Sequence, residues 1–160
     1  MDSAQYAELF LTESREHVSA INHSLLELER GEGGAEPVGA IFRAVHTIKG
    51  MSATMGYGPV AALSHELETL LDRVRRGVRS IDALLMDLLF RSADILEQAI
   101  ESSVSGSADS ADVDAMVAAL QFQQRVIDGG DVLAALVEKE LGVLGAIHAR
   151  RRTGWNEADP

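Results

Sequence analysis

The sequence reads FRAVHTIKG at residues 42–50 and LSHELE at residues 63–68, and the spacing of apolar residues predicts a helix for each segment. In the first segment, one apolar face is formed at i, i+4, i+7 and i+14 by Ile41, Val45, Ile48 and Met55. A face of this kind is expected to lie against a core. The polar residues beside it are therefore candidates for a site at the edge of that core.

His46 is the first of these candidates, because it lies about 100° around the helix from Val45. Lys49 and Gly50 follow it at i+3 and i+4, on the same side. A glycine inside a helix costs roughly 1 kcal/mol relative to alanine, so we expect Gly50 to leave the imidazole open to another protein. The ammonium group of Lys49 favours an anion such as a phosphoryl group near the ring and disfavours a metal cation.

The second segment offers partners for that imidazole. His65 and Glu68 are spaced i, i+3 on one face of the following helix. The carboxylate of Glu68 is expected to accept the Nδ1–H of His46. That hydrogen bond would fix the tautomer, orient the ring and leave Nε2 as a nucleophile.

Composition limits the class of protein. The 14 basic and 25 acidic residues give a net charge of −11, which argues against a nucleic-acid partner or an anionic membrane. The chain has no cysteine, so it holds no disulfide and no thiolate metal site. Its polar amino terminus is unlike a signal peptide, and no apolar run reaches the ~18 residues of a membrane span. We expect a cytoplasmic protein without membrane insertion.

Apolar periodicity and helix-stop signals divide the whole chain into helices. The predicted fold is all-α, an antiparallel four-helix bundle with a fifth helix and an additional C-terminal helix. Residues 1–125 are expected to form the bundle domain with its fifth helix, and residues 126–160 a C-terminal amphipathic helix and tail. Ser3 and Ser80 are the expected N-caps of the first and fourth helices. Tyr6 and Leu84 are expected in the apolar faces of the same two helices. Gly56 is expected to end the second helix in a left-handed conformation.

The sequence also resembles a known family, over about residues 3–122. The matching pieces are Phe42–Gly50, Met55–Tyr57, His65–Asp72 and Arg75–Gly77. They resemble the histidine phosphotransfer (HPt, P1) domain at the amino terminus of CheA-type chemotaxis histidine kinases. The resemblance implies an HPt-like bundle in which His46 is the phosphoacceptor, Glu68 orients it, Lys49 stabilises phosphoryl charge and His65 belongs to the surrounding hydrogen-bond network.

The resemblance further implies a phosphohistidine carrier in two-component signalling. His46 would accept a phosphoryl group from a kinase domain that binds Mg-ATP, and would pass it to an aspartate of a response regulator receiver domain. The chain has no Walker-type loop, so we expect it to bind no cofactor and to be no enzyme by itself. It would be either a fragment of a histidine kinase or a free-standing phosphotransfer protein.

Two alternatives remain at this point. His46, His65 and Glu68 could form a metal-binding set inside a bundle, although the charge of Lys49 opposes a metal and Gly50 has no purpose in such a site. The chain could also be a helical-bundle interaction module without chemistry.

Overall fold

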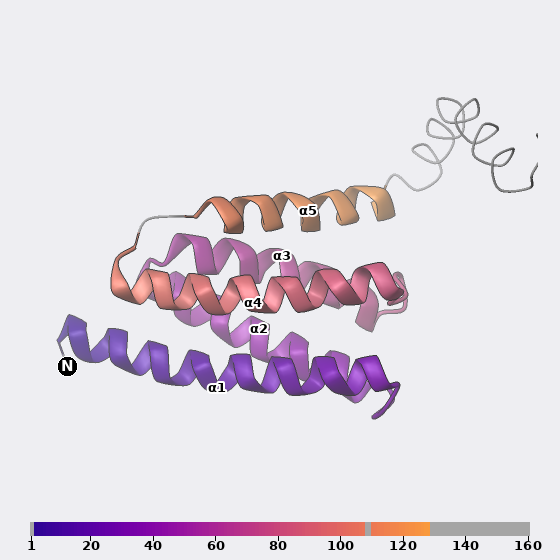
Figure 1. Cartoon of the computed structure of the whole chain (residues 1–160), viewed down its shortest axis with the longest axis horizontal. Coiled ribbons are helices and arrows are strands. Elements are labelled where there is room, and N and C mark those ends of the chain that lie inside the picture. Colours follow the sequence, from indigo (N-terminus) through magenta and orange to yellow (C-terminus); the bar gives the residue numbers. More distant parts are fainter. Residues whose placement is uncertain (1, 108–109, 129–160) are drawn as a thin grey trace, which may run out of the picture. The chain divides into compact units, whose positions relative to one another are not determined.

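The computed structural model describes residues 2–107 and 110–128, and within these ranges every regular element is a helix (Figure 1). The helices are α1 (Ser3–Arg30), α2 (Glu36–Met55), α3 (Gly58–Arg75), α4 (Ala83–Ser105) and α5 (Ala111–Asp128). The all-α prediction is confirmed. The predicted C-terminal helix lies outside the described residues.

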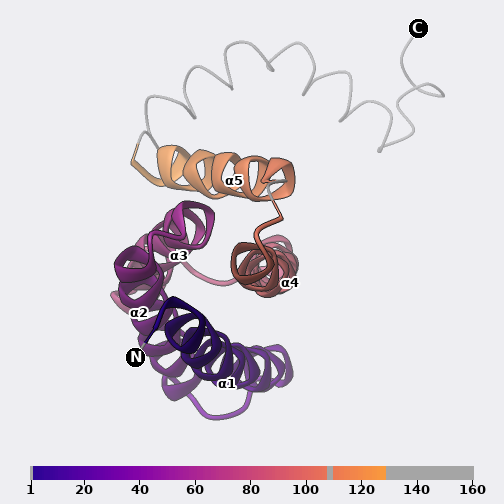
Figure 2. The ribbon, with the colours of Figure 1, turned by 90° about the vertical axis from the view of Figure 1, so that its left-hand side faces the viewer.

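Helices α1 to α4 form a closed bundle. Each of α1 and α3 packs on both α2 and α4, and the view along the bundle in Figure 2 shows the four helices around a common centre. Short connections make successive helices antiparallel. The core is aliphatic, and its largest fully buried side chains include Leu25, Ile48, Leu63, Leu70, Leu71, Leu85, Leu96 and Ile100.

The chain divides into two compact units, Met1–Phe122 and Gln123–Pro160, so the boundary falls inside α5. Within the first unit, the beginning of α5 buries Val113, Met116 and Leu120. Gln121 Nε2 donates a hydrogen bond of 3.1 Å to Glu66 Oε1 on α3. This part of α5 therefore contributes to the same body as the bundle.

The turn between α2 and α3 brings the candidate site residues of the two helices together, because α2 ends where α3 can turn back along it. Gly56 takes φ 74°, and its N–H donates to the carbonyl of Ala53 at 3.2 Å. The N–H of Tyr57 donates to Ser52 O at 2.9 Å, which completes a Schellman-type end. The left-handed conformation predicted for Gly56 is confirmed.

The two predicted caps were wrong by one or two residues. Asp2 caps α1, where its Oδ1 accepts the N–H of Gln5 at 2.9 Å and Gln5 Oε1 accepts the N–H of Asp2 in return. Asp82 caps α4 by accepting the N–H of Leu85 at 2.8 Å. A carboxylate is as good a cap as a serine hydroxyl, and each aspartate stands directly before its helix.

Two residues of the predicted apolar faces are in fact exposed. Tyr6 is 50% and Leu84 63% exposed. Both lie in the first turns of their helices, where Phe10 on α1 and Leu85 on α4 are the residues that enter the core. Helix α4 continues to Ser105 and is capped by Gly106, which takes a left-handed conformation with φ 78°.

Substitution by alanine should change stability in opposite directions at Gly50, inside α2, and at Gly56, which directly follows α2. Gly56→Ala forces an L-residue into the left-handed region and should lower the free energy of unfolding by about 1–2 kcal/mol. Gly50 is helical, and a Cβ there meets no atom of the described residues within 4 Å, so Gly50→Ala should raise the free energy of unfolding by about 0.5–1 kcal/mol. Urea denaturation measures both; shifts in the same direction would contradict this account.

Candidate phosphoacceptor site

The predicted pair of His46 and Glu68 forms across the α2–α3 interface. His46 Nδ1 lies 2.8 Å from Glu68 Oε2. The two side chains differ in accessibility, since the imidazole is 63% exposed and the carboxylate 19%. The ring therefore stands on the surface while its partner is held at the edge of the core.

Lys49 binds the other oxygen of the same carboxylate. Its Nζ lies 2.9 Å from Glu68 Oε1, and its side chain is 29% exposed. Glu68 thus joins the imidazole on one oxygen and an ammonium group on the other. In this arrangement the charge of Lys49 acts on Glu68 directly; the contact with a phosphoryl group stays a prediction.

The ionisation of Glu68 decides the tautomer of His46. Burial raises the pKa of this carboxyl, but the hydrogen bonds from Lys49 and His46 and the positive charge near it outweigh burial and lower the pKa below its ordinary value. An ionised carboxylate only accepts hydrogen bonds, so Nδ1 of His46 must be the donor. In the neutral ring, the lone pair is then on Nε2, which is the nitrogen that can attack.

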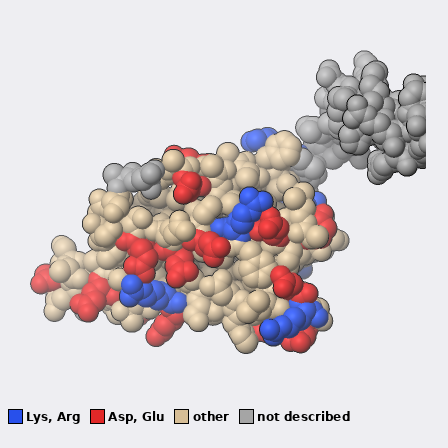
Figure 3. Space-filling model, viewed as in Figure 1, with Lys and Arg blue, Asp and Glu red and all other residues tan. Residues whose placement is uncertain are grey.

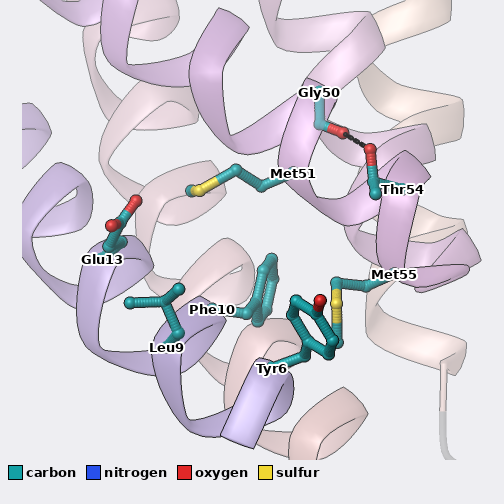
Figure 4. A pocket seen from close by; sticks show the side chains of 8 residues that line it. All are labelled: Tyr6, Leu9, Phe10, Glu13, Gly50, Met51, Thr54 and Met55. Carbon is teal, nitrogen blue, oxygen red and sulfur yellow. Dashed lines mark hydrogen bonds between the residues drawn. The ribbon is translucent and has the colours of Figure 1, made fainter. Parts of the chain in front are cut away.

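Gly50 lies beside a surface pocket between α1 and α2. The pocket has a volume of about 370 Å³ and is lined by Tyr6, Leu9, Phe10, Glu13, Gly50, Met51, Thr54 and Met55. Figure 4 shows the aromatic rings of α1 facing the methionines of α2, with the Thr54 hydroxyl donating to the carbonyl of Gly50 at 3.1 Å. Among the described residues, neither backbone strain nor crowding requires glycine here. The expected role of Gly50 in the approach of a partner stays a prediction.

His65 is not joined to the other predicted residues. Its side chain is exposed, and among the described residues its ring makes no hydrogen bond. The contact with a side chain is at its backbone carbonyl, which accepts a hydrogen bond from the Thr69 hydroxyl. The metal hypothesis needs His46, His65 and Glu68 to converge. Over the described ranges, no group of three histidine, aspartate or glutamate side chains is arranged to hold a metal ion.

The structure adds two residues that the sequence reasoning missed. The ring of Phe42 is nearly parallel to that of His46, with an interplanar angle of 14° and centroids 6.3 Å apart. The guanidinium carbon of Arg75 lies 4.1 Å from the centroid of Phe42. The i, i+4 spacing of Phe42 and His46 was available as a signal, but the position of Arg75 depends on how α3 packs on α2.

The charge distribution is mixed around these helices. On the face shown in Figure 3, acidic and basic side chains are interspersed. None of the helices in the described part of the chain is long and apolar enough to cross a membrane.

Comparisons with known proteins identify the family. The family model of the Hpt domain matches residues 5–123. The chain is 42% identical over 120 residues to the chemotaxis protein CheA of Bacillus subtilis (strain 168), an alignment that covers 75% of this chain and 18% of CheA. The chain thus spans less than a fifth of the length of these curated CheA relatives.

Two solved structures share the fold. The CheA phosphotransferase domain from Thermotoga maritima is 35% identical, with a TM-score of 0.61 and coverage of 65% of this chain and 99% of that one. The phosphorylated P1 domain of CheA3 from R. sphaeroides, crystallised in complex with CheY6, is 29% identical, with a TM-score of 0.70 and coverage of 75% and 95%. The chain therefore belongs to the Hpt domain family and, within it, to the P1 phosphotransferase domains of CheA.

Proposed function

We propose that this chain is a phosphohistidine carrier in chemotaxis two-component signalling and that His46 is its phosphoacceptor. The observation that carries the proposal is the contact of 2.8 Å between Nδ1 of His46 and an ionised Glu68, on a ring that is 63% exposed. The contact occupies one nitrogen of the ring and leaves the other one, with its lone pair, to the surface.

In the first step, Nε2 of His46 attacks the γ-phosphorus of ATP. An N–P bond forms, the bond from phosphorus to the β,γ-bridging oxygen breaks, and ADP leaves. The imidazole gains positive charge as its lone pair is shared, and the carboxylate at Nδ1 stabilises that charge. Lys49 keeps Glu68 ionised and adds positive potential near the incoming phosphoryl group.

In the second step, a carboxylate oxygen of an aspartate on a receiver domain attacks the same phosphorus. The N–P bond breaks and its electron pair returns to Nε2, which restores the neutral ring. Gly50, one turn from His46 and without a side chain, lets the receiver approach the imidazole closely. The chain thus supplies the acceptor and its orientation, while the partners supply the nucleotide and the aspartate.

Both partners are proposed from the relatives. CheA proteins match this chain over less than a fifth of their own length, so the Mg-ATP-binding kinase domain would be a separate domain of the same protein or another chain. The R. sphaeroides P1 domain was crystallised with CheY6, and a receiver domain of that type is the proposed acceptor here. We propose a cytoplasmic location for this function, as expected for a protein that works with such partners.

The chain alone with Mg-ATP should take up no phosphate, because its residues offer a nucleophile without a nucleotide cradle. With a CheA-type kinase domain added, His46 should be labelled through an acid-labile, base-stable bond. The measurement is radiolabel transfer from [γ-³²P]ATP, followed by mapping of the labelled residue.

The matched variants for this experiment are His46→Gln and His23→Gln. His23 also pairs with a glutamate, Glu27, but through Nε2 at 3.1 Å and on an open surface. His46→Gln should abolish the label and His23→Gln should keep it. Self-labelling by the purified chain, or label that survives His46→Gln, would refute the proposal.

Glu68→Gln should slow labelling by about tenfold without unfolding the bundle. A neutral amide oxygen still accepts the Nδ1–H, but charge-assisted hydrogen bonds are about twice as strong as neutral ones. Initial rates with the kinase domain measure the effect, and Glu27→Gln is the control for charge removal at a histidine partner. A rate equal to wild type would remove Glu68 from the mechanism.

The lowered pKa of Glu68 predicts that the stability difference between wild type and Glu68→Gln depends on pH. Because the pKa of Glu68 is lowered in the folded state from its ordinary 4.5, its ionised form stabilises the fold at neutral pH, and that contribution is lost as the pH falls through the lowered value. Urea denaturation should therefore show wild type more stable than Glu68→Gln at pH 7, with the difference shrinking below about pH 4.5. A difference that grows on acidification would contradict the pKa direction.

A further inference from the structure

The surroundings of His46 extend one turn further along both helices. On α2, Phe42 precedes His46 by four residues, and the two rings are nearly parallel, at 14°. On α3, Asp72 follows Glu68 by four residues and so lies on the same face. Since α2 and α3 run antiparallel, Phe42 on α2 lies at the same height along the bundle as Asp72 and Arg75 on α3.

Asp72 repeats the bridging arrangement of Glu68. Its Oδ1 lies 2.6 Å from Nη2 of Arg75, and its Oδ2 lies 3.1 Å from Nε of Arg76. Arg75 in turn lies over the face of Phe42, with 4.1 Å between its guanidinium carbon and the ring centroid. A continuous set of contacts thus runs from Asp72 through Arg75 and Phe42 to the imidazole of His46.

Glu68 alone leaves a degree of freedom in the imidazole. One hydrogen bond does not fix the ring, because the χ1 and χ2 torsions of His46 can change together with the side chain of Glu68 while the bond is kept. Such a coupled movement carries Nε2 across the surface, and the nearly parallel ring of Phe42, with its centroid 6.3 Å from that of the imidazole, limits it from one side. Phosphoryl transfer depends on placing the attacking atom in line with the leaving oxygen, so the ring plane matters as much as its tautomer.

We propose that Arg75 and Phe42 are positioning residues that hold the plane of the His46 ring for phosphoryl transfer. The inference rests on the proposed function. Arg75 fixes the ring of Phe42 by a cation–π contact and is itself fixed by Asp72; Phe42 transmits the constraint to His46. Neither residue touches the phosphoryl group.

The alternative explanation for Arg75 is that it is one charge of a basic patch that attracts a partner. Arg76 separates the two roles, because it binds the same aspartate and carries the same charge, while the guanidinium over Phe42 belongs to Arg75. Loss of a docking charge should raise the KM for the chain as a substrate in either variant. Loss of ring positioning should lower the maximal rate in one of them only.

The experiment compares Arg75→Gln with Arg76→Gln in the full chain, labelled by a CheA-type kinase domain at varied chain concentration. Arg75→Gln should lower the maximal rate about two- to fivefold, the factor expected for an exposed cation–π contact, with KM unchanged. Arg76→Gln should keep the wild-type maximal rate. Arg75→Lys, which keeps a cation for the ring, should recover part of the loss.

A double-mutant cycle tests whether the effect passes through Phe42. Phe42→Leu keeps an apolar side chain of similar size and should slow transfer as Arg75→Gln does. Phe42→Leu combined with Arg75→Gln should be no slower than the slower single variant. Circular dichroism and urea denaturation establish that each variant is folded.

NMR gives a readout that needs no phosphate. The ring-proton shifts of His46 should move in Phe42→Leu and Arg75→Gln, while the ¹⁵N signals that report the Nδ1–H tautomer stay as in wild type. Equal maximal rates for Arg75→Gln and Arg76→Gln, a change in KM alone, or additive effects in the cycle would overturn the inference and leave the proposed function standing. A wild-type chain that takes no label would overturn both.

Discussion

The carboxylate of Glu68 is the group on which the site depends, since it holds His46 by one oxygen and Lys49 by the other. The helix packing that brings these residues together is fixed by their neighbours in the sequence. Val45, Ile48 and Leu67 each adjoin one of the three and are almost fully buried, at 1%, 0% and 4% exposure. A shift of α3 along α2 would break the core contacts and the polar contacts together. The site therefore inherits its precision from the core, which is the least adjustable part of the bundle.

Helix α3 uses a carboxylate in the same way twice, one turn apart. Glu68 joins a histidine and a lysine, and Asp72 joins two arginines. In each case the carboxylate contacts two donor groups, and the positive charge that these groups carry compensates its negative charge at the surface. This local compensation matters in a chain with a net charge of −11, because the proposed function brings an anionic phosphate donor to His46. Pairing the acids nearest the site removes part of the repulsion that the overall charge would otherwise cause.

The parts that could be predicted from the sequence are those governed by local spacing. Helical periodicity located α2 and α3. The hydrogen bond between His46 and Glu68 could be predicted because each of the two helices carries one of the partners. The caps at Asp2 and Asp82 were missed because serine and aspartate are nearly equivalent in this role. The contact of Arg75 with Phe42 depends on how α3 is rotated about its own axis against α2. The spacing of residues in the sequence does not determine that angle. For the same reason the exposed ring of His65 could not be distinguished from a member of the site.

The proposed function, in which His46 serves two partners in turn, requires the imidazole to be exposed. A buried imidazole would gain from a low dielectric, but it could reach neither a nucleotide on one protein nor an aspartate on another. The structure instead buries the groups that control the ring, with Glu68 19% and Lys49 29% exposed, and leaves 63% of His46 at the surface. Gly50 fits this division, since its missing side chain costs the helix stability that an alanine would add, although no atom of the described residues lies within 4 Å of where a Cβ would stand. Under the proposed function, this loss of stability is offset by the closer approach that the missing side chain allows to a second protein.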